Sequence, residues 1–256
     1  MHAVNAAAAT SLLHVRNVTI SYPTEDGVFT AVEDVTFSVA RGERFVILGP
    51  SGCGKSTLLK SIAGFMGVAA GAIDLDGHTV QGPGPDRVVV FQEFDQLLPW
   101  KTVLGNVMYP LRVARKLSDA SARETARRFI GMVGLDRFAD TYPHQLSGGM
   151  KQRVAIARSL ALDPAMLLMD EPFASLDALT RRRMQDELLA IWEATHKALL
   201  FVTHSIEEAV LLGDRILVLS GGPGRVRRIL ENSAAGHRDS ESASKTKHDV
   251  QALLGE

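Results

Sequence analysis

The sequence predicts an α/β fold with a mostly parallel sheet core, an antiparallel β layer and an inserted α-helical subdomain. Between residues 13 and 48, apolar side chains alternate with polar ones, which is typical of half-buried antiparallel strands. Between residues 148 and 219, helix-like segments alternate with short apolar segments, which indicates a parallel sheet. Between these two regions, residues from about 93 to 150 have apolar side chains at helical spacing, which predicts the inserted helical subdomain.

Local signals place the individual elements. Asp76-Gly77 lies between two short strand candidates and predicts a hairpin. Ser118 and Asp119 are N-cap candidates for a helix over 120–133, and Gly134 is its C′ candidate. Apolar runs and helical spacing predict the remaining core elements, which are strands at 44–48, 87–92, 166–169, 198–202 and 215–219, and helices at 148–162, 179–195 and 206–212.

Composition limits the partners and the location. The chain has 28 Lys and Arg against 29 Asp and Glu, and its formal net charge is −1. This balance indicates no general attraction to nucleic acid or to an anionic membrane surface. The longest apolar runs fall far short of the ~20 residues that span a bilayer, and the N-terminus lacks the pattern of a secretory signal. We therefore expect a cytoplasmic location and no nucleic-acid partner.

The ends of the chain differ in composition from its middle. Residues 1–11 are alanine-rich and are expected to be flexible, whereas 12–231 carry the patterned, folded domain. Residues 232–256 are dense in Ser, Ala, charged residues and His without apolar periodicity, which predicts a mobile polar tail. A short docking helix near 250–254 is the alternative. The single cysteine, Cys53, excludes an internal disulfide.

The most informative motif is a nine-residue run from 49 to 57, between an apolar strand and an amphipathic helix. It matches the phosphate-binding pattern G-x-x-x-x-G-K-[ST], whose glycines turn backbone N–H groups inward toward an anion. Lys55 is a flexible charge that reaches the β- and γ-phosphates, and the Ser56 hydroxyl is a ligand for Mg²⁺. The alternative is a glycine-rich turn with a solvated lysine. The nine residues are Gly49, Pro50, Ser51, Gly52, Cys53, Gly54, Lys55, Ser56 and Thr57.

Polar residues follow three of the predicted strands, where functional groups of a parallel sheet collect. Asp170 is a candidate Mg²⁺ ligand, and Glu171 is a candidate base for the water that attacks a γ-phosphate. The alternative for this pair is an ordinary charge cluster at a helix N-terminus. His204 is a candidate hydrogen-bond partner of a γ-phosphate oxygen, or a structural histidine. Gln92 is a candidate contact to Mg²⁺ or water, or a loop cap.

A second anion-binding segment occurs at Ser147, Gly148 and Gly149, which open a predicted helix. Ser147 is a good N-cap, and the helix presents its positive end there. One chain therefore carries two anion-binding segments and one acid pair, Asp170 and Glu171. This arrangement makes sense when the second surface serves a nucleotide held by another copy, so we expect a head-to-tail dimer.

With these motifs in this order, the sequence resembles the ATP-binding subunits of ABC transporters across nearly all of residues 12–230. The match covers six motifs of that family, namely Walker A at 49–57, the glutamine loop at Gln92, the signature motif at 146–152, the Walker B acids Asp170 and Glu171, the D-loop at 174–177 and the switch histidine His204.

The resemblance implies a P-loop NTPase-type core and hydrolysis of ATP with Mg²⁺. It implies that two copies sandwich two ATP molecules, each between one copy's Walker A motif and the other copy's signature motif. Tyr22 resembles the family's aromatic residue that stacks on adenine, with an ordinary edge-strand tyrosine as the alternative. Asp177, in the D-loop, joins the nucleotide-binding set by the same resemblance.

Two further stretches, 82–87 and 91–107, resemble importers of the nitrate, sulfonate and taurine group. The resemblance implies integral membrane permease subunits as partners, a solute-binding protein as an indirect partner, and a peripheral place at the cytoplasmic face of the inner membrane. It also makes Leu97, Leu98 and Trp100 candidates for the permease contact, or ordinary subdomain core. An exporter-type subunit and a soluble ABC ATPase without a transport partner are the alternatives.

Overall fold

The computed structural model describes residues 11–25, 27–91, 96–174 and 176–255. The chain divides into two compact units. The first unit combines Met1–Gly84 with Lys197–Glu256, and the second unit is Pro85–His196. The expected flexible segment 1–11 lies outside the described residues except for Ser11, which begins the first strand.

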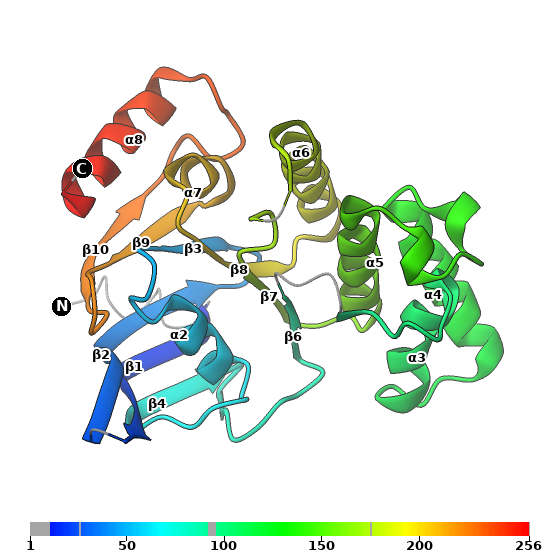
Figure 1. Ribbon diagram of the computed structural model, residues 1–256, viewed down its shortest axis with the longest axis horizontal. Helices are drawn as coiled ribbons and strands as arrows, with labels where there is room; N and C mark the ends of the chain where they lie inside the picture. Colours follow the sequence, from blue (N-terminus) through cyan, green and yellow to red (C-terminus); the bar gives the residue numbers. More distant parts are fainter. Residues whose placement is uncertain (1–10, 26, 92–95, 175, 256) are drawn as a thin grey trace. The chain divides into compact units, whose positions relative to one another are not determined.

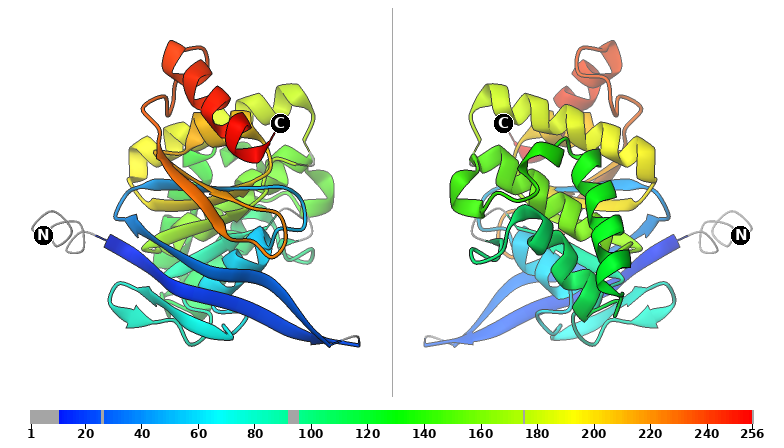
Figure 2. Two further views of the ribbon diagram at one scale, coloured as in Figure 1. Left: turned by 90° about the vertical axis from the view of Figure 1, so that its left-hand side faces the viewer. Right: turned by 90° about the vertical axis from the view of Figure 1, so that its right-hand side faces the viewer.

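An antiparallel sheet of four strands lies in the first unit, in the order β2-β1-β4-β5. Its strands are β1 (Ser11–Thr24), β2 (Gly27–Ala40), β4 (Ala70–Leu75) and β5 (His78–Thr79). Figure 2 shows β1 and β2 as a long, twisted ribbon with β4 beside it. The predicted antiparallel layer is confirmed, since Val15 pairs with Phe37 and both side chains are buried. The hairpin predicted at Asp76-Gly77 is also present, and both residues have a positive φ there.

The parallel strands of the first unit surround β3 (Arg44–Leu48), which is buried along its whole length. β3 pairs in parallel with β8 (Ala198–Thr203) on one side and with β9 (Arg215–Leu219) on the other. Helices α2 (Lys55–Ile62) and α7 (Ile206–Leu212) follow β3 and β8. One further strand, β10 (Val226–Glu231), pairs antiparallel with β9. β10 was not predicted from the sequence, since three of its six residues are charged, and none of its residues is buried in the structure.

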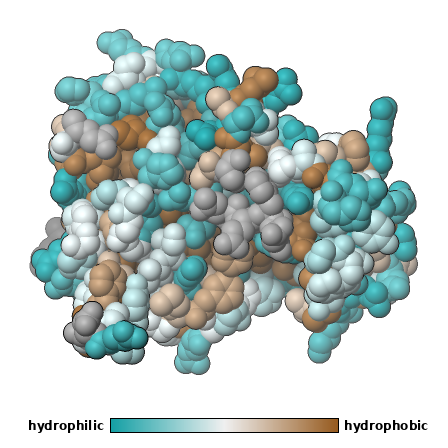
Figure 3. All heavy atoms as spheres, in the orientation of Figure 1, coloured by the Kyte–Doolittle hydropathy of each residue, from teal (hydrophilic) through white to brown (hydrophobic). Residues whose placement is uncertain are grey.

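The C-terminal segment differs from the polar tail expected over 232–256. It forms helix α8 (Glu241–Leu254), and the Ser240 hydroxyl caps it by accepting a hydrogen bond from the N–H of Ala243. Ala243 and Val250 are buried, and α8 packs against α7 and β9. Figure 3 shows hydrophilic residues over the outer side of this helix. Two buried apolar side chains and a good N-cap dock a helix whose other positions are mostly polar.

The second unit contains the parallel strand pair β6 (Arg87–Val90) and β7 (Met166–Asp170) and a group of helices (Figure 1). Three of the helices pack against one another, namely α3 (Val103–Val113), α4 (Asp119–Met132) and α5 (Gly148–Ala161). The unit ends with α6 (Ala178–Thr195), and short 3₁₀ turns lie at η2 (Asp136–Phe138) and η3 (Pro143–Gln145). The predicted cap is confirmed, since Ser118 caps α4 through the N–H of Ser121.

The helical subdomain expected over 93–150 extends further than predicted. Helix α5 packs with α3 and α4, and its residues Val154, Ala155 and Ala157 are buried. Within the described part of the chain, no helix has the combination of length and apolar character that a bilayer crossing requires.

Candidate nucleotide site

The phosphate loop connects β3 to α2 in the first unit, as the sequence predicts. Gly52 and Gly54 have φ values of 79° and 93°, a region that residues with a Cβ rarely adopt. Gly54 is also pressed against strand β2, because a Cβ added there would lie 2.5 Å from the carbonyl oxygen of Ala31. The loop therefore requires glycine at position 54 for both its conformation and its packing.

Lys55 lies across this loop rather than in solvent. Its Nζ donates hydrogen bonds to the carbonyl oxygens of Gly49 at 2.8 Å and Pro50 at 2.9 Å, and the residue is only 4% exposed. The alternative of a solvated lysine in a plain turn is thus wrong. An ammonium held over a loop of backbone N–H groups is a site for an anion with several negative charges.

The turn between β9 and β10 packs against the phosphate loop, a contact that no sequence pattern predicts. Gly224 accepts a hydrogen bond from Glu33 N–H and donates one to the Ala31 carbonyl, both at 2.9 Å. A Cβ added to Gly224 would lie 2.1 Å from the carbonyl oxygen of Cys53. The Cys53 side chain is buried.

His204 follows β8 and lies in the same unit as the loop. A cavity of about 80 Å³ is lined by His204, Gly49 and Pro50, together with Arg227 of β10 and Leu254 at the end of α8. The structure thus brings the predicted switch histidine to the first residues of the phosphate loop. Arg227 also donates a hydrogen bond to the Leu253 carbonyl, which fixes the end of α8 beside this cavity.

A buried hydrogen bond holds the backbone around His204. Thr203 Oγ1 donates to Glu208 Oε2 at 2.6 Å and accepts a hydrogen bond from Ser205 N–H at 3.0 Å. The Ser205 hydroxyl then caps α7 by accepting from Glu208 N–H at 3.3 Å. Thr203 and Glu208 are therefore positioning residues that the sequence analysis missed. An acid four residues after a switch histidine, at the start of a helix, is the signal that indicates them.

Tyr22 lies near the end of β1 in the first unit and is 37% exposed. Its ring packs against Phe29 of β2, with ring centroids 5.4 Å apart and an angle of 42° between the planes. A half-exposed ring beside a second aromatic ring offers a face on which a flat base can stack. This geometry fits the adenine role, which stays a prediction.

The acid pair lies in the second unit, at the end of β7. Asp170 is the last residue of the strand, and Glu171 follows it with a φ of 44°. Positive φ costs a non-glycine residue roughly 1–3 kcal/mol and is often found where a side chain must be aimed at a reaction. Six other described non-glycine residues also have a positive φ, so the catalytic role of Glu171 stays a prediction.

The signature segment opens α5 in the second unit. The Ser147 hydroxyl is exposed and accepts a hydrogen bond from Met150 N–H at 3.3 Å, which confirms the predicted N-cap. Gly148 and Gly149 form the first turn of a 14-residue helix. The exposed N-terminus of this helix is a site where an anion is stabilised by free N–H groups and by the helix dipole.

Asp177 of the D-loop caps α6. Its Oδ1 accepts hydrogen bonds from the N–H groups of Leu179 at 3.1 Å and Thr180 at 3.0 Å. Hydrogen bonds from Thr180 and from these N–H groups lower the pKa of the Asp177 carboxyl, so the group stays ionised. The structure shows a capping role, and the nucleotide contact predicted for Asp177 stays a prediction.

Two predicted residues of the site, Gln92 and the D-loop residue Ser175, lie outside the described residues. The Gln96 side chain accepts a hydrogen bond from the N–H of Phe91 at 3.2 Å and donates one to the Phe91 carbonyl at 2.9 Å. Of the candidate permease contacts, Trp100 is 70% exposed whereas Leu97 is buried. Leu97 is therefore subdomain core, and Trp100 keeps the predicted role.

Comparisons with known proteins agree with this set of motifs. The model of the ABC transporter family matches residues 32–174. The nitrate import ATP-binding protein NrtD of Synechococcus elongatus is 46% identical over 219 residues, covering 85% of this chain and 80% of that protein. The taurine import ATP-binding protein TauB of Rhizobium johnstonii is 48% identical over 237 residues, covering 88% of each chain.

Solved structures match in the same way. A dimeric ATP-binding cassette in a post-hydrolysis state, bound to ADP and Pi, aligns with a TM-score of 0.75 and 34% identity, covering 86% of this chain and 98% of that one. The cbiO1 protein of Clostridium perfringens aligns with a TM-score of 0.78 and 27% identity, over 96% of this chain and 98% of that one. The family model spans more than half of the chain, and relatives with 46% and 48% identity cover most of it, so the chain belongs to the ABC transporter family of ATP-binding proteins.

Proposed function

We propose that this chain is the ATP-hydrolysing subunit of a membrane importer, in which two copies close head to tail over two ATP molecules. The observation that carries the proposal is the separation of two anion sites in one chain. The phosphate loop with Lys55 lies in the first unit, and the capped helix beginning at Ser147 lies in the second. A relative of known structure is a dimer bound to ADP and Pi, which supports pairing of copies.

In this proposal each group has a defined task. The N–H groups of the phosphate loop and Lys55 bind the β- and γ-phosphates, and Tyr22 stacks on the adenine. Glu171 accepts a proton from the attacking water, while His204 donates a hydrogen bond to a γ-phosphate oxygen. Ser147 and the first turn of α5 bind the γ-phosphate of the nucleotide held by the second copy.

The donor set also suits a magnesium ion. The Ser56 hydroxyl and the Asp170 carboxylate are hard oxygen ligands, which Mg²⁺ prefers together with phosphate oxygens. When bound, the ion would neutralise charge that develops on the phosphates. Gln92 is the third predicted ligand.

The transport partner is proposed from the relatives. Proteins that are 46–49% identical to this chain are named for nitrate and taurine import. We therefore infer permease subunits as direct partners, a solute-binding protein as an indirect one, and a peripheral place at the cytoplasmic face of the inner membrane. The exposed Trp100 is the apolar anchor for the permease contact. The solute is nitrate, taurine, another sulfonate or a related small molecule.

A reconstituted system tests this function. The chain is co-expressed with the permease and solute-binding protein encoded beside it, and ATP hydrolysis is measured in vesicles with nitrate, taurine or an alkanesulfonate. We expect hydrolysis to rise when the solute-binding protein carries its solute. An exporter-type subunit would show no dependence on a solute-binding protein, and a chain that hydrolyses ATP but binds no permease would be a soluble ABC ATPase.

The Glu171→Gln variant tests the chemistry separately. It should still bind ATP and should lose about 10²- to 10⁴-fold in turnover, because the attacking water no longer has a base. Near-normal turnover in this variant would remove Glu171 from its role.

A further inference from the structure

Helix α6 connects the signature segment to the D-loop at its N-terminal end. The signature glycine Gly149 lies against Thr180, since a Cβ added to Gly149 would be 3.2 Å from the Thr180 methyl carbon. Thr180 is in the first turn of α6, where its N–H is capped by Asp177. The two functional segments therefore meet through the first turns of α5 and α6.

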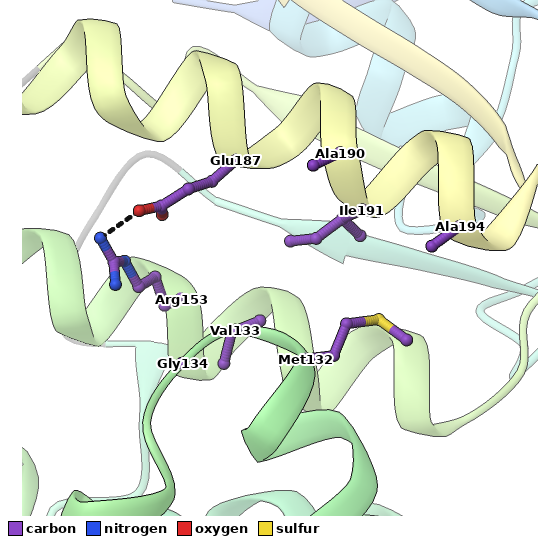
Figure 4. A pocket seen from close by; sticks show the side chains of 8 residues that line it. All are labelled: Met132, Val133, Gly134, Arg153, Glu187, Ala190, Ile191 and Ala194. Atoms are coloured by element: carbon purple, nitrogen blue, oxygen red, sulfur yellow. Dashed lines mark hydrogen bonds and ion pairs between the residues drawn. The ribbon is translucent and has the colours of Figure 1, made fainter.

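A second contact joins the same two helices further along. Arg153 of α5 forms an ion pair with Glu187 of α6, shown as a dashed line in Figure 4. Arg153 follows Gly149 by four residues and Glu187 follows Thr180 by seven, so both contacts lie on one face of each helix. The pair is partly buried, since the side chains are 27% and 37% exposed, and burial raises the pKa of the Glu187 carboxyl while Arg153 opposes this rise.

Beyond the ion pair, a cavity separates α6 from the neighbouring elements. It has a volume of about 350 Å³, and Figure 4 shows Ile191 and Ala194 of α6 on one wall and Met132 at the end of α4 on the other. Arg153 and Glu187 also line this cavity, so the ion pair lies at its edge.

The D-loop is in turn fastened to α6. Arg181 donates hydrogen bonds to the carbonyl oxygens of Phe173 at 3.3 Å and Leu176 at 2.9 Å. The next turn back along the chain is closed by Ala174 N–H, which donates to the Glu171 carbonyl at 3.1 Å. An unbroken series of contacts therefore runs from Arg153 and Glu187 through α6 to the backbone of Glu171.

We propose that Arg153 and Glu187 are positioning residues that make the signature segment and the D-loop move as one body. The inference rests on the proposed function, in which Ser147 serves the second copy's nucleotide while Glu171 serves the chain's own. A rigid connection between the signature segment and Glu171 would make hydrolysis at one ATP site depend on whether the other site holds ATP. Breaking the ion pair should therefore reduce the cooperativity of hydrolysis more than it reduces ATP binding.

The test is ATP hydrolysis as a function of ATP concentration, on the full transport complex. For two coupled sites we expect a Hill coefficient of about 1.5–2 in the wild type, falling to about 1 in Glu187→Gln and Arg153→Gln. ATP affinity of the isolated chain should change by less than about twofold, because neither residue touches the phosphate loop. The charge-swapped double variant, Arg153→Glu with Glu187→Arg, should recover part of the cooperativity that each single change removes.

A matched control uses another ion pair of the second unit, Arg112 with Asp119, whose Nε–Oδ1 distance is 2.8 Å. Arg112→Gln should leave the Hill coefficient unchanged. Normal wild-type hydrolysis with a Hill coefficient near 1, or an unchanged coefficient in both single variants, would overturn the inference and leave the proposed function intact. A wild-type chain that neither hydrolyses ATP nor pairs with a second copy would instead overturn the proposed function itself.

Discussion

The contact between Gly224 and the phosphate loop leads to a prediction that sequence motifs alone do not make. Gly224→Ala would place a Cβ at 2.1 Å from the Cys53 carbonyl oxygen, where ordinary van der Waals contact begins near 3.4 Å. Gly224 is held on both sides by backbone hydrogen bonds of 2.9 Å to Ala31 and Glu33. The loop must therefore give way, and its carbonyl has to move by about 1 Å.

The cost of this movement is estimated from overpacking. Forcing a methyl group into a closely packed site costs about 1–3 kcal/mol, which corresponds to about five- to 150-fold in an equilibrium constant. Because the displaced atoms belong to the anion-binding loop, we expect most of this cost to appear as weaker ATP binding. Displacing catalytic geometry by about 1 Å also lowers turnover, by up to about 10²-fold.

The measurement is the dissociation constant of ATP by calorimetry, with a thermal unfolding curve to show that the variant is folded. The matched control is Gly221→Ala in the same turn, where an added Cβ meets nothing within 4 Å and binding should stay at the wild-type value. If folded Gly224→Ala bound ATP as tightly as Gly221→Ala, the β9–β10 turn would have no part in shaping the loop.

Three further changes test the packing. Asp74→Asn removes an ionised hydrogen-bond acceptor, whose pKa is lowered by the hydrogen bond from Thr79 and by Arg16. The change should lower the unfolding free energy by about 1–2 kcal/mol at pH 7. The difference between the two proteins should shrink as the pH falls below 3.8, the ordinary pKa of the carboxyl, since the stabilising ionised form is then lost. Asp214→Asn leaves the buried Arg44 guanidinium without its carboxylate and should lower the unfolding free energy in urea by about 3 kcal/mol; a loss below about 0.5 kcal/mol would contradict this. Val250→Asp should detach α8 from the domain, because it would bury a charged side chain. Amide hydrogen exchange should then be faster in residues 241–254 and unchanged in β3. Equal exchange protection in the variant and the wild type would show that Val250 does not hold the helix in place.

Much of the fold was predictable because strong local signals agree with the tertiary structure. The strand before the phosphate loop is buried on every residue, and the hairpin at Asp76-Gly77 and the caps at Ser118 and Ser147 each have a clear chemical signature. For the site, the place of the loop between a buried strand and a helix was predictable, since its glycine positions and its lysine match the phosphate-binding pattern, and the roles of its residues stay predictions.

What could not be predicted depends on contacts between segments distant in sequence. Gly224 touches Cys53 only because β9 and β10 form a turn beside the loop, and nothing in the residues around it indicates an approach that close. The C-terminal helix was expected only as a short alternative near 250–254, because two buried positions, Ala243 and Val250, do not make a visible apolar period in a polar segment. The ion pair of Arg153 and Glu187 likewise joins two helices whose faces the sequence leaves undetermined.

The head-to-tail pairing of two copies is the central claim, and mixing two inactive variants tests it most directly. Lys55→Ala should fail to bind ATP, because the ammonium of the phosphate loop is lost, and Ser147→Arg should bind ATP without hydrolysing it. In an equal mixture, dimers that contain one copy of each variant hold one complete site, made from Lys55 of one chain and Ser147 of the other. We predict that hydrolysis in the mixture rises well above that of either variant, toward about a quarter of the wild-type rate. A mixture as inactive as its two components would contradict the shared site.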